Sequence, residues 1–281
     1  MSSAALPTPP LARKLRTWWT ILRISLDERF IYRGDFMLGT LMRFLPMVPQ
    51  FFLWSALFAS QNKETMFGFR YTDIVAYYLL TMVSRAFSSM PGLASTIAKQ
   101  IRDGEIKKFL IQPIDLLSFL LLGRVAHKIA YFAVATLPFA LVFFLCRSYF
   151  PPVPSWEIWL AFLASLLMSF ALGFFLEASL GLIGFWFLEV SSLLFIYMLF
   201  NFFLSGHMFP LDMLPPTLQF LVKCLPLQYM AYFPAAIFLG KIQGADLAWG
   251  LAGQAAWLVF FIFLSRRLFA RGVKRYSAFG G

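Results

Sequence analysis

Long apolar blocks separated by short polar stretches dominate the pattern of this chain. Six of the blocks approach the roughly 20 residues that a helix needs to cross the hydrocarbon layer of a membrane. They cover residues 36–59, 73–97, 119–146, 157–180, 186–207 and 247–267. The connections are short, and no internal repeat is visible. The pattern therefore predicts an all-α integral membrane protein, with six transmembrane helices in a single domain over residues 34–267.

An amphipathic segment precedes the first apolar block. Residues 11–33 place Leu and Trp side chains at helical spacing along one side, with Arg13, Arg16 and Arg23 on the other. A basic face opposite Trp is typical of a helix that lies in the membrane interface, and an ordinary soluble amphipathic helix is the alternative. Residues 1–10 are polar and rich in Pro, so we expect a disordered tail without a cleavable signal peptide.

The stretch over residues 98–115, AKQIRDGEIKKFLIQPID, is too charged to lie in a membrane. Its charged residues are Lys99, Arg102, Asp103, Glu105, Lys107, Lys108 and Asp115. Apolar side chains are interspersed among these charges, so the stretch is more than a solvated linker. We predict a short amphipathic helix within about 101–115, ended by Pro113, that docks on a cytoplasmic partner. The alternative is a helix that rests on lipid headgroups.

The apolar segment over residues 208–240 contains too many prolines for one straight span. Pro210, Pro215, Pro216, Pro226 and Pro234 interrupt it. Two short helices that enter the outer leaflet and return, as a re-entrant segment, would fit this pattern. Irregular backbone at such a depth is tolerated only where protein buries it or a cavity hydrates it. The alternative is a loop with a buried apolar plug.

Composition agrees with a membrane protein, and the charge distribution predicts its orientation. The chain is 60% hydrophobic and only 13% charged, against about 25% charged residues in soluble domains. The net charge of +11 does not indicate nucleic acid, because the basic residues flank apolar blocks and suit anionic headgroups. Six lie in residues 11–33, six in 98–128 and five from Arg266 onward, against five in the opposite loops. This asymmetry predicts that both termini, including the basic tail 268–281, are cytoplasmic.

No catalytic or metal-binding motif stands out. His127 and His207 lie in different blocks, without acids at metal-binding spacing. Cys146 and Cys224 either pair near the outer face or remain two free thiols. The Gly-Lys dipeptide that ends at Lys241 lacks the glycine spacing of a phosphate loop. We therefore predict that the chain is not an enzyme and holds no cofactor, and that any ATP and Mg²⁺ bind a separate partner.

Charged residues inside the apolar blocks are the remaining candidates for function. Arg85 lies near the middle of the block 73–97, where it must face an acid, a carbonyl or a hydrated cavity. Two roles are open for it, a structural ion pair or a place in a transport pathway. Arg43 lies nearer to the end of its block, from which its side chain can reach the headgroups.

Four further polar residues lie in or beside the fourth and fifth blocks. Glu177 and Glu189 flank the join between them, which we place as a tight cytoplasmic turn at residues 181–184, so both are expected to be solvated. Asn201 and His207 lie in the outer half of the fifth block. Like the central arginine, Glu189, Asn201 and His207 are candidates for a transport pathway, and a structural role is the alternative.

These features together resemble the permease subunits of type-two ABC exporters, the group that includes O-antigen, drug and lipid exporters. The interfacial helix, the six spans and the DGEIKKFLIQPID loop after the second span carry the resemblance. The run LSGHMFPLDMLPPTLQFLVKCLPLQYM is similar to the outer re-entrant segment of that family. The basic end, SRRLFARGVKRYSAFGG, resembles a bacterial branch whose permeases often occur in pairs. The long extracellular domain of some relatives is missing.

The resemblance implies a permease that forms its substrate pathway as a dimer in the bacterial inner membrane, with a second permease chain that is the same or homologous. It places the coupling helix of the family at residues 104–113, where this helix would transmit the motion of a separate ATPase dimer. The implied coupling residues are Arg102, Gly104, Glu105, Lys107, Lys108, Phe109, Leu110 and Pro113. We expect Phe109 and Leu110 to fill a groove of the ATPase, with the charges at the rim.

Two other classes of protein stay open as alternatives. A secondary transporter would show an internal repeat with paired broken helices, and a membrane enzyme acting on lipid would show a cluster of catalytic residues. Neither signal is visible in the sequence. Membrane lipids are expected partners in every case, and nucleic acid in none. An aromatic-lined path suits amphiphiles or hydrophobic cations as the transported molecules.

Overall fold

The computed structural model describes residues 11–30, 33–112, 114–152, 154–187 and 189–276 as a mostly helical chain with a small hairpin. The helices are α1 (Leu11–Phe30), α2 (Arg33–Phe44), α3 (Met47–Gln61), α4 (Tyr71–Ser88), α5 (Leu93–Arg102), α6 (Lys107–Leu110), α7 (Leu116–Leu145), α8 (Trp156–Leu182), α9 (Ser191–Leu204), α10 (Pro216–Lys223), α11 (Tyr232–Phe238) and α12 (Gly244–Arg275). Short 3-10 helices are η1 (Arg147–Tyr149), η2 (Ile183–Phe185), η3 (Leu211–Met213) and η4 (Pro226–Met230), and the hairpin pairs β1 (Thr65–Met66) with β2 (Phe69–Arg70). The predicted tail 1–10, the helix stop at Pro113 and residues 277–281 lie outside the described residues.

In the described part of the chain, four helical stretches are long and apolar enough to cross a membrane. They are Met37–Gln61, Leu116–Leu145, Trp156–Phe185 and Gly244–Arg275. These stretches match the first, third, fourth and sixth predicted spans in length and composition, except that the last helix continues through most of the predicted basic tail. The fifth apolar block forms a shorter helix, α9, of 14 residues. The predicted count of six spans therefore stays a prediction.

The second predicted span, over residues 73–97, is not a single helix. α4 ends at Ser88 and α5 begins at Leu93, and we call residues 89–92 between them the helix break. Pro91 disfavours helical backbone at the residue before it, and Gly92 adopts a φ of +71°, which ends the helical path. As a correction to the prediction, Arg85 lies in the last turn of α4 rather than near the centre of a continuous span.

The tight turn predicted at residues 181–184 is also wrong. α8 continues through this stretch into η2, and the chain turns afterwards, before α9 begins. Gly181 and Gly184 serve close helix contact instead: an added Cβ would lie 2.6 Å from the Ala94 carbonyl oxygen and 3.2 Å from the Ala98 Cα, respectively. The glycines that suggested a turn therefore let α5 pack directly against α8.

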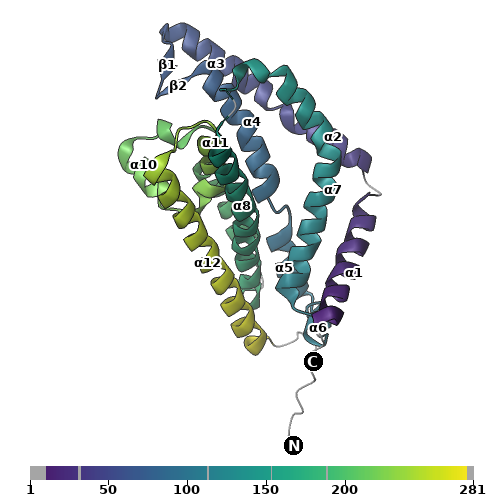
Figure 1. Cartoon of the computed structure of the whole chain (residues 1–281). Helices are drawn as coiled ribbons and strands as arrows, with labels where there is room; N and C mark the ends of the chain where they lie inside the picture. Colours follow the sequence, from purple (N-terminus) through teal and green to yellow (C-terminus); the bar gives the residue numbers. More distant parts are fainter. Residues whose placement is uncertain (1–10, 31–32, 113, 153, 188, 277–281) are drawn as a thin grey trace, which may run out of the picture.

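α8 lies at the centre of the fold, with α4, α5, α11 and α12 packed around it (Figure 1). A buried polar cluster joins α8 to α12. Gln254 donates to the Ser165 carbonyl at 2.9 Å and to the Ser169 hydroxyl at 3.0 Å, and the Ser165 hydroxyl donates back to the Gln254 amide oxygen at 2.9 Å. Such a satisfied network fixes the register of two otherwise apolar helices. α1 and α2 pack on the other side of the molecule, against α7 (Figure 1).

The predicted amphipathic helix is present as α1, over Leu11–Phe30 rather than the predicted 11–33, and Trp19 and Ile24 are exposed on it. Its place in a membrane interface stays a prediction. The proline-rich segment 208–240 contains the expected short helices. Of these, α11 is almost wholly buried against α4 and α8, which satisfies the condition for irregular backbone at membrane depth. Insertion of this segment into the outer leaflet stays a prediction.

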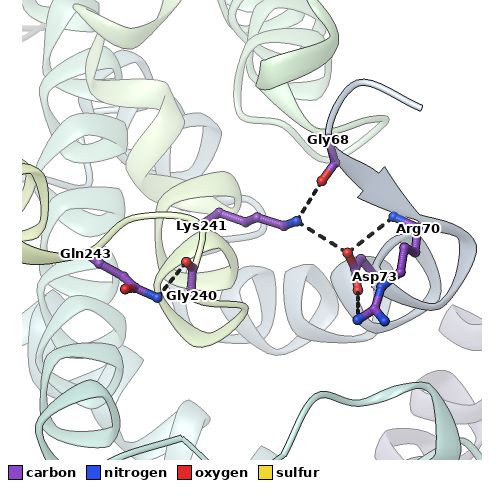
Figure 2. Close-up of polar contacts among 6 residues, drawn as sticks. All are labelled: Gly68, Arg70, Asp73, Gly240, Lys241 and Gln243. Atoms are coloured by element: carbon purple, nitrogen blue, oxygen red, sulfur yellow. Dashed lines mark hydrogen bonds and ion pairs between the residues drawn. The ribbon is translucent and has the colours of Figure 1, made fainter. Parts of the chain in front are cut away.

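Different elements form the two ends of the fold. The start of α1, the end of α12 and α6 lie together at one end, and the hairpin and α10 lie toward the other (Figure 1). Figure 2 shows how Lys241, which follows α11, fastens the hairpin end. Its ammonium group donates to the Gly68 carbonyl at 2.8 Å and lies 3.3 Å from the Asp73 carboxylate, which also pairs with Arg70 at 3.3 Å. We call these four residues the Lys241 clasp.

Candidate functional site

The charged stretch after α5 is built from two short pieces rather than one helix. α5 ends at Arg102, a turn follows in which Gly104 has a φ of +80°, and α6 covers only the four residues Lys107–Leu110. The predicted helix over about 101–115 is therefore too long. The left-handed conformation at Gly104 ends one helical path, as it commonly does just after a helix. We call residues 103–112 the docking loop.

Contacts within the docking loop and at both of its ends fix it to the body of the protein. Ile101 and Ile106 are buried in an apolar cluster with residues of α7 and α8. Asp115 accepts a hydrogen bond from the Ser118 amide at 2.8 Å, which caps α7, and it pairs with Arg266 on α12. Burial raises the pKa of Asp115, but the hydrogen bonds from Ser118 and Arg266 outweigh it and hold this pKa below its ordinary value.

The outer surface of the docking loop combines bare apolar side chains with charge. Leu110 is 39% exposed and Ile111 is 83% exposed. Lys107 and Lys108 are exposed beside them, and Lys108 pairs with Glu105 at 3.2 Å. Phe109, which we expected to be a contact residue, is half-buried and packs against the Phe119 ring at 5.3 Å between centroids.

The sequence already contained a signal for Ile111, because it follows an apolar pair and lies two residues before Pro113, but its exposure depends on how α6 ends. Arg102 and Glu189 meet at this end of the molecule, 3.5 Å apart. Glu189 is 64% exposed at its side chain and lies before α9, so the structure groups it with the docking loop and not with the other pathway candidates.

Charged side chains converge on the helix break from two neighbouring helices. From α7, Lys128 donates to the Ala86 carbonyl and, at 2.8 Å, to the Ser89 carbonyl, and Arg124 donates to the Pro91 carbonyl at 3.0 Å. The end of α4 has unpaired carbonyls and a partial negative charge, so cations stabilise it. Arg124 and Lys128 had been grouped with the cytoplasmic charges, but their spacing of four residues inside an apolar block could have marked them.

From α8, Glu177 binds the opposite side of the helix break. Its carboxylate interacts with the backbone amides of Met90, in the helix break, and of Ala94, in the first turn of α5. An acid is favourable there because the first amides of a helix are unpaired and carry partial positive charge. The expectation that Glu177 is solvated near a turn is therefore wrong, since that turn is absent and the residue belongs to the helix break.

Two cavities adjoin the helix break, and Arg85 lines both. The first, about 430 Å³, is lined by Arg85, Glu177 and Asn201 among others. The second, about 380 Å³, is lined by Arg43, Arg85 and His207, with Gln50, Tyr78 and Met82, and we call it the arginine cavity. Arg85 contacts the His207 ring directly. The structure thus brings Arg85, Asn201 and His207 together, whereas Glu189 lies elsewhere.

Other candidate chemistry is absent from the described part of the chain. No group of three or more His, Cys, Asp or Glu residues there could hold a metal ion. Cys146 and Cys224 are free thiols, so of the two alternatives the structure shows the unpaired one.

Comparison with known proteins gives one family. A family model described as ABC-2 family transporter protein matches residues 44–280, from the end of α2 through α12. No curated protein matches the chain. The family match covers the docking loop, the helix break and the proline-rich segment.

Proposed function

Since the chain belongs to the ABC-2 family of transporter proteins and is a type-2 ABC transporter permease, we propose that it exports its substrate with energy from a separate ATPase subunit. Family membership sets aside the two alternatives that the sequence left open, a secondary transporter and a lipid-acting enzyme. ATP and Mg²⁺ bind the partner, because the chain has no phosphate loop. The observation that carries the proposal is the docking loop.

The surface of the docking loop suits a protein groove. Leu110 and Ile111 are bare, adjacent and flanked by Lys107, Lys108 and Glu105. Interfaces of this kind combine apolar anchors that fill a pocket with charges at the rim that set orientation. We assign the main contact to Leu110 and Ile111 rather than to Phe109, whose ring is already packed within its own chain.

The path from the docking loop to the cavities runs through α5. The loop continues directly from α5, and α5 begins at the helix break, where Glu177 and Arg124 hold the backbone. A displacement of the loop by the ATPase would therefore move α5 against α8 and change the shape of the cavities at the break. Two distant sites can be coupled in this way when a rigid element between them has two discrete arrangements.

The remaining parts of the proposal concern assembly and orientation. We propose a permease dimer, with the same chain or a homologous one, that encloses the pathway. The 14-residue helix α9 has no buried residue, so its surface is available to a partner chain or to lipid. In this arrangement α4 and α5 together form one broken crossing, and α9 forms the fifth. The end that carries the docking loop faces the cytoplasm of a bacterial cell, across the inner membrane.

The test is recovery of the ATPase by purified permease. Leu110→Ala combined with Ile111→Ala should weaken association, by about 1–3 kcal/mol per anchor that becomes buried. A matched control is Leu137→Ala with Leu141→Ala, which removes two exposed apolar side chains from α7, 73% and 55% exposed, far from the docking loop. Equal recovery and unchanged ATPase stimulation in the docking-loop variant would show that this loop does not couple the two subunits.

A further inference from the structure

The arginine cavity holds positive charge that the protein does not neutralise. Arg43 and Arg85 both line it, and among the described residues neither guanidinium has a carboxylate within ion-pair distance. Arg43 contacts a neutral side chain, donating to the Tyr131 hydroxyl at 3.3 Å and lying over the Tyr131 ring. Arg85 contacts the His207 ring. Arg85 is half-buried and Arg43 is exposed on the apolar stretch beside it. A cation withdrawn from water without a counter-charge is costly unless a ligand supplies that charge.

His207 adds a second unmet requirement, for a hydrogen-bond acceptor. A guanidinium group has donors and no acceptor, so the His207 Nε2 that faces Arg85 must be the acceptor. The proton of the neutral ring is then on Nδ1. This Nδ1 atom is buried and has no hydrogen-bond partner among the described residues. A buried donor without a partner is destabilising, and a ligand oxygen would satisfy it.

Basic side chains at the adjoining helix break add to the positive charge of the arginine cavity. Arg124 and Lys128 lie at the adjoining helix break, where carbonyl groups occupy their bonds, and Glu177 is the acid that faces them. Four basic side chains therefore accompany a single acid around Ser89 and Pro91, which line the arginine cavity. A hydrophobic cation would be repelled here. An anion would be attracted.

Part of the cavity wall is apolar. Pro46, Met47 and Met82 line it beside the guanidinium groups. Next to them, Leu45 and Val48 are 63% and 46% exposed on the membrane-crossing stretch formed by α2 and α3. A molecule with its charge between the arginines can therefore lay a hydrocarbon tail along this stretch.

We propose that the arginine cavity binds the anionic head group, a phosphate or carboxylate, of an amphiphile, and that such an amphiphile is the transported substrate. The guanidinium groups of Arg43 and Arg85 pair with the head group, and His207 donates to it through Nδ1. The binding step stands on the cavity alone, whereas transport of the ligand rests on the proposed function.

The experiment measures binding to the purified protein in nanodiscs of zwitterionic lipid, by the shift of its thermal unfolding midpoint. Dodecyl phosphate should raise the midpoint, and dodecyltrimethylammonium, with the same tail and opposite charge, should not. Inorganic phosphate alone should raise the unfolding midpoint far less than dodecyl phosphate. An equal effect of the two would overturn the proposal that the ligand is an amphiphile. Nanodiscs with phosphatidylglycerol test a resident lipid as the source. If dodecyl phosphate cannot compete there, the occupant is a membrane lipid and the substrate assignment fails.

Variants test the residues. Arg85→Gln and Arg43→Gln should each reduce the affinity for dodecyl phosphate by about tenfold or more, the loss of one charge-assisted hydrogen bond. Arg85→Lys should recover part of it, because the charge returns without the planar fork. Arg147→Gln is the control, since Arg147 lies over the Phe144 ring outside the cavity. If Arg85→Gln fails to fold, Arg43→Gln and Arg85→Lys still decide. Unchanged affinity for dodecyl phosphate in both Arg43→Gln and Arg85→Lys would overturn the site. Recovery of the ATPase is measured separately, so it can be intact while this proposal fails.

Discussion

The contact between the end of α4 and α8 gives the sharpest prediction of stability. Gly173 on α8 lies directly against Ser88, the last residue of α4. A Cβ atom added at Gly173 would lie 2.1 Å from the Ser88 carbonyl oxygen and 3.1 Å from its carbonyl carbon. Ordinary van der Waals contact begins at 3.4 Å, so Gly173→Ala would force the two backbones apart by about 1.3 Å.

The magnitude follows from three contributions. Overpacking of this kind costs about 1–3 kcal/mol, and a backbone carbonyl cannot swing aside as a flexible side chain can. Moving Ser88 also weakens the bond from its hydroxyl to the Met230 carbonyl, 2.8 Å long, at a cost of about 1 kcal/mol. Alanine gains about 1 kcal/mol over glycine in helix propensity. We therefore expect a net loss of about 1–3 kcal/mol in the free energy of unfolding.

The assay compares thermal unfolding midpoints in one detergent. Gly123→Ala is the matched control, because it makes the same change within α7 where no atom lies within 4 Å of the new Cβ. The control should be as stable as the wild type or slightly more so, and Gly173→Ala should unfold at a clearly lower temperature. Equal midpoints for Gly173→Ala and wild type would refute the close approach of α4 to α8.

Three further predictions follow from the two ends of the molecule. The lowered pKa of Asp115 means that its contribution to stability is present above the ordinary value of about 3.9 and is lost as the pH falls further. Asp115→Asn should therefore be less stable than wild type at pH 6, and a difference in unfolding midpoint that does not shrink toward pH 3 would contradict the assignment. Lys241→Met should speed proteolysis within the hairpin while sparing the docking loop; uniform cleavage of both would argue against a local clasp. With the native cysteines removed, a cysteine at Lys63 should react with an impermeant thiol reagent outside the cell, and one at Lys107 should not; the reverse pattern would invert the proposed orientation.

Sequence periodicity predicted the apolar helices well, because membrane-crossing length and hydropathy are properties of a single segment. It failed where tertiary contact decides. Residues 73–97 read as one span, since Pro91 and Gly92 are tolerated in membrane helices when neighbours satisfy the freed backbone groups. The neighbours that do so, Lys128 and Glu177, come from other helices and carry no local signal of their target. A glycine can mark either a turn or a close helix contact, and the sequence does not distinguish the two. For this reason Gly181, which lies against α5, was predicted to be in a turn.

The candidate site shows the same division. Charge density identified the docking loop, and rarity of charge in apolar blocks identified Arg85. The partnership of Arg85 with His207 spans more than a hundred residues of sequence, and only the fold brings them together. Which apolar side chain of the loop stays bare depends on how α6 ends, so Ile111 could be recognised only after Phe109 was seen to pack on Phe119.

The helix break has a mechanical consequence. If α4 and α5 formed one continuous helix, a displacement of the docking loop would be transmitted along it to the hairpin and would pull on the Lys241 clasp. The interruption at residues 89–92 instead separates α4 from α5, and the side chains of Arg124 and Lys128 hold the backbone between them. If the ATPase displaces the docking loop as we propose, α5 can tilt while the Lys241 clasp stays closed. On that proposal, the cavities at the break would change shape without disturbing the hairpin end.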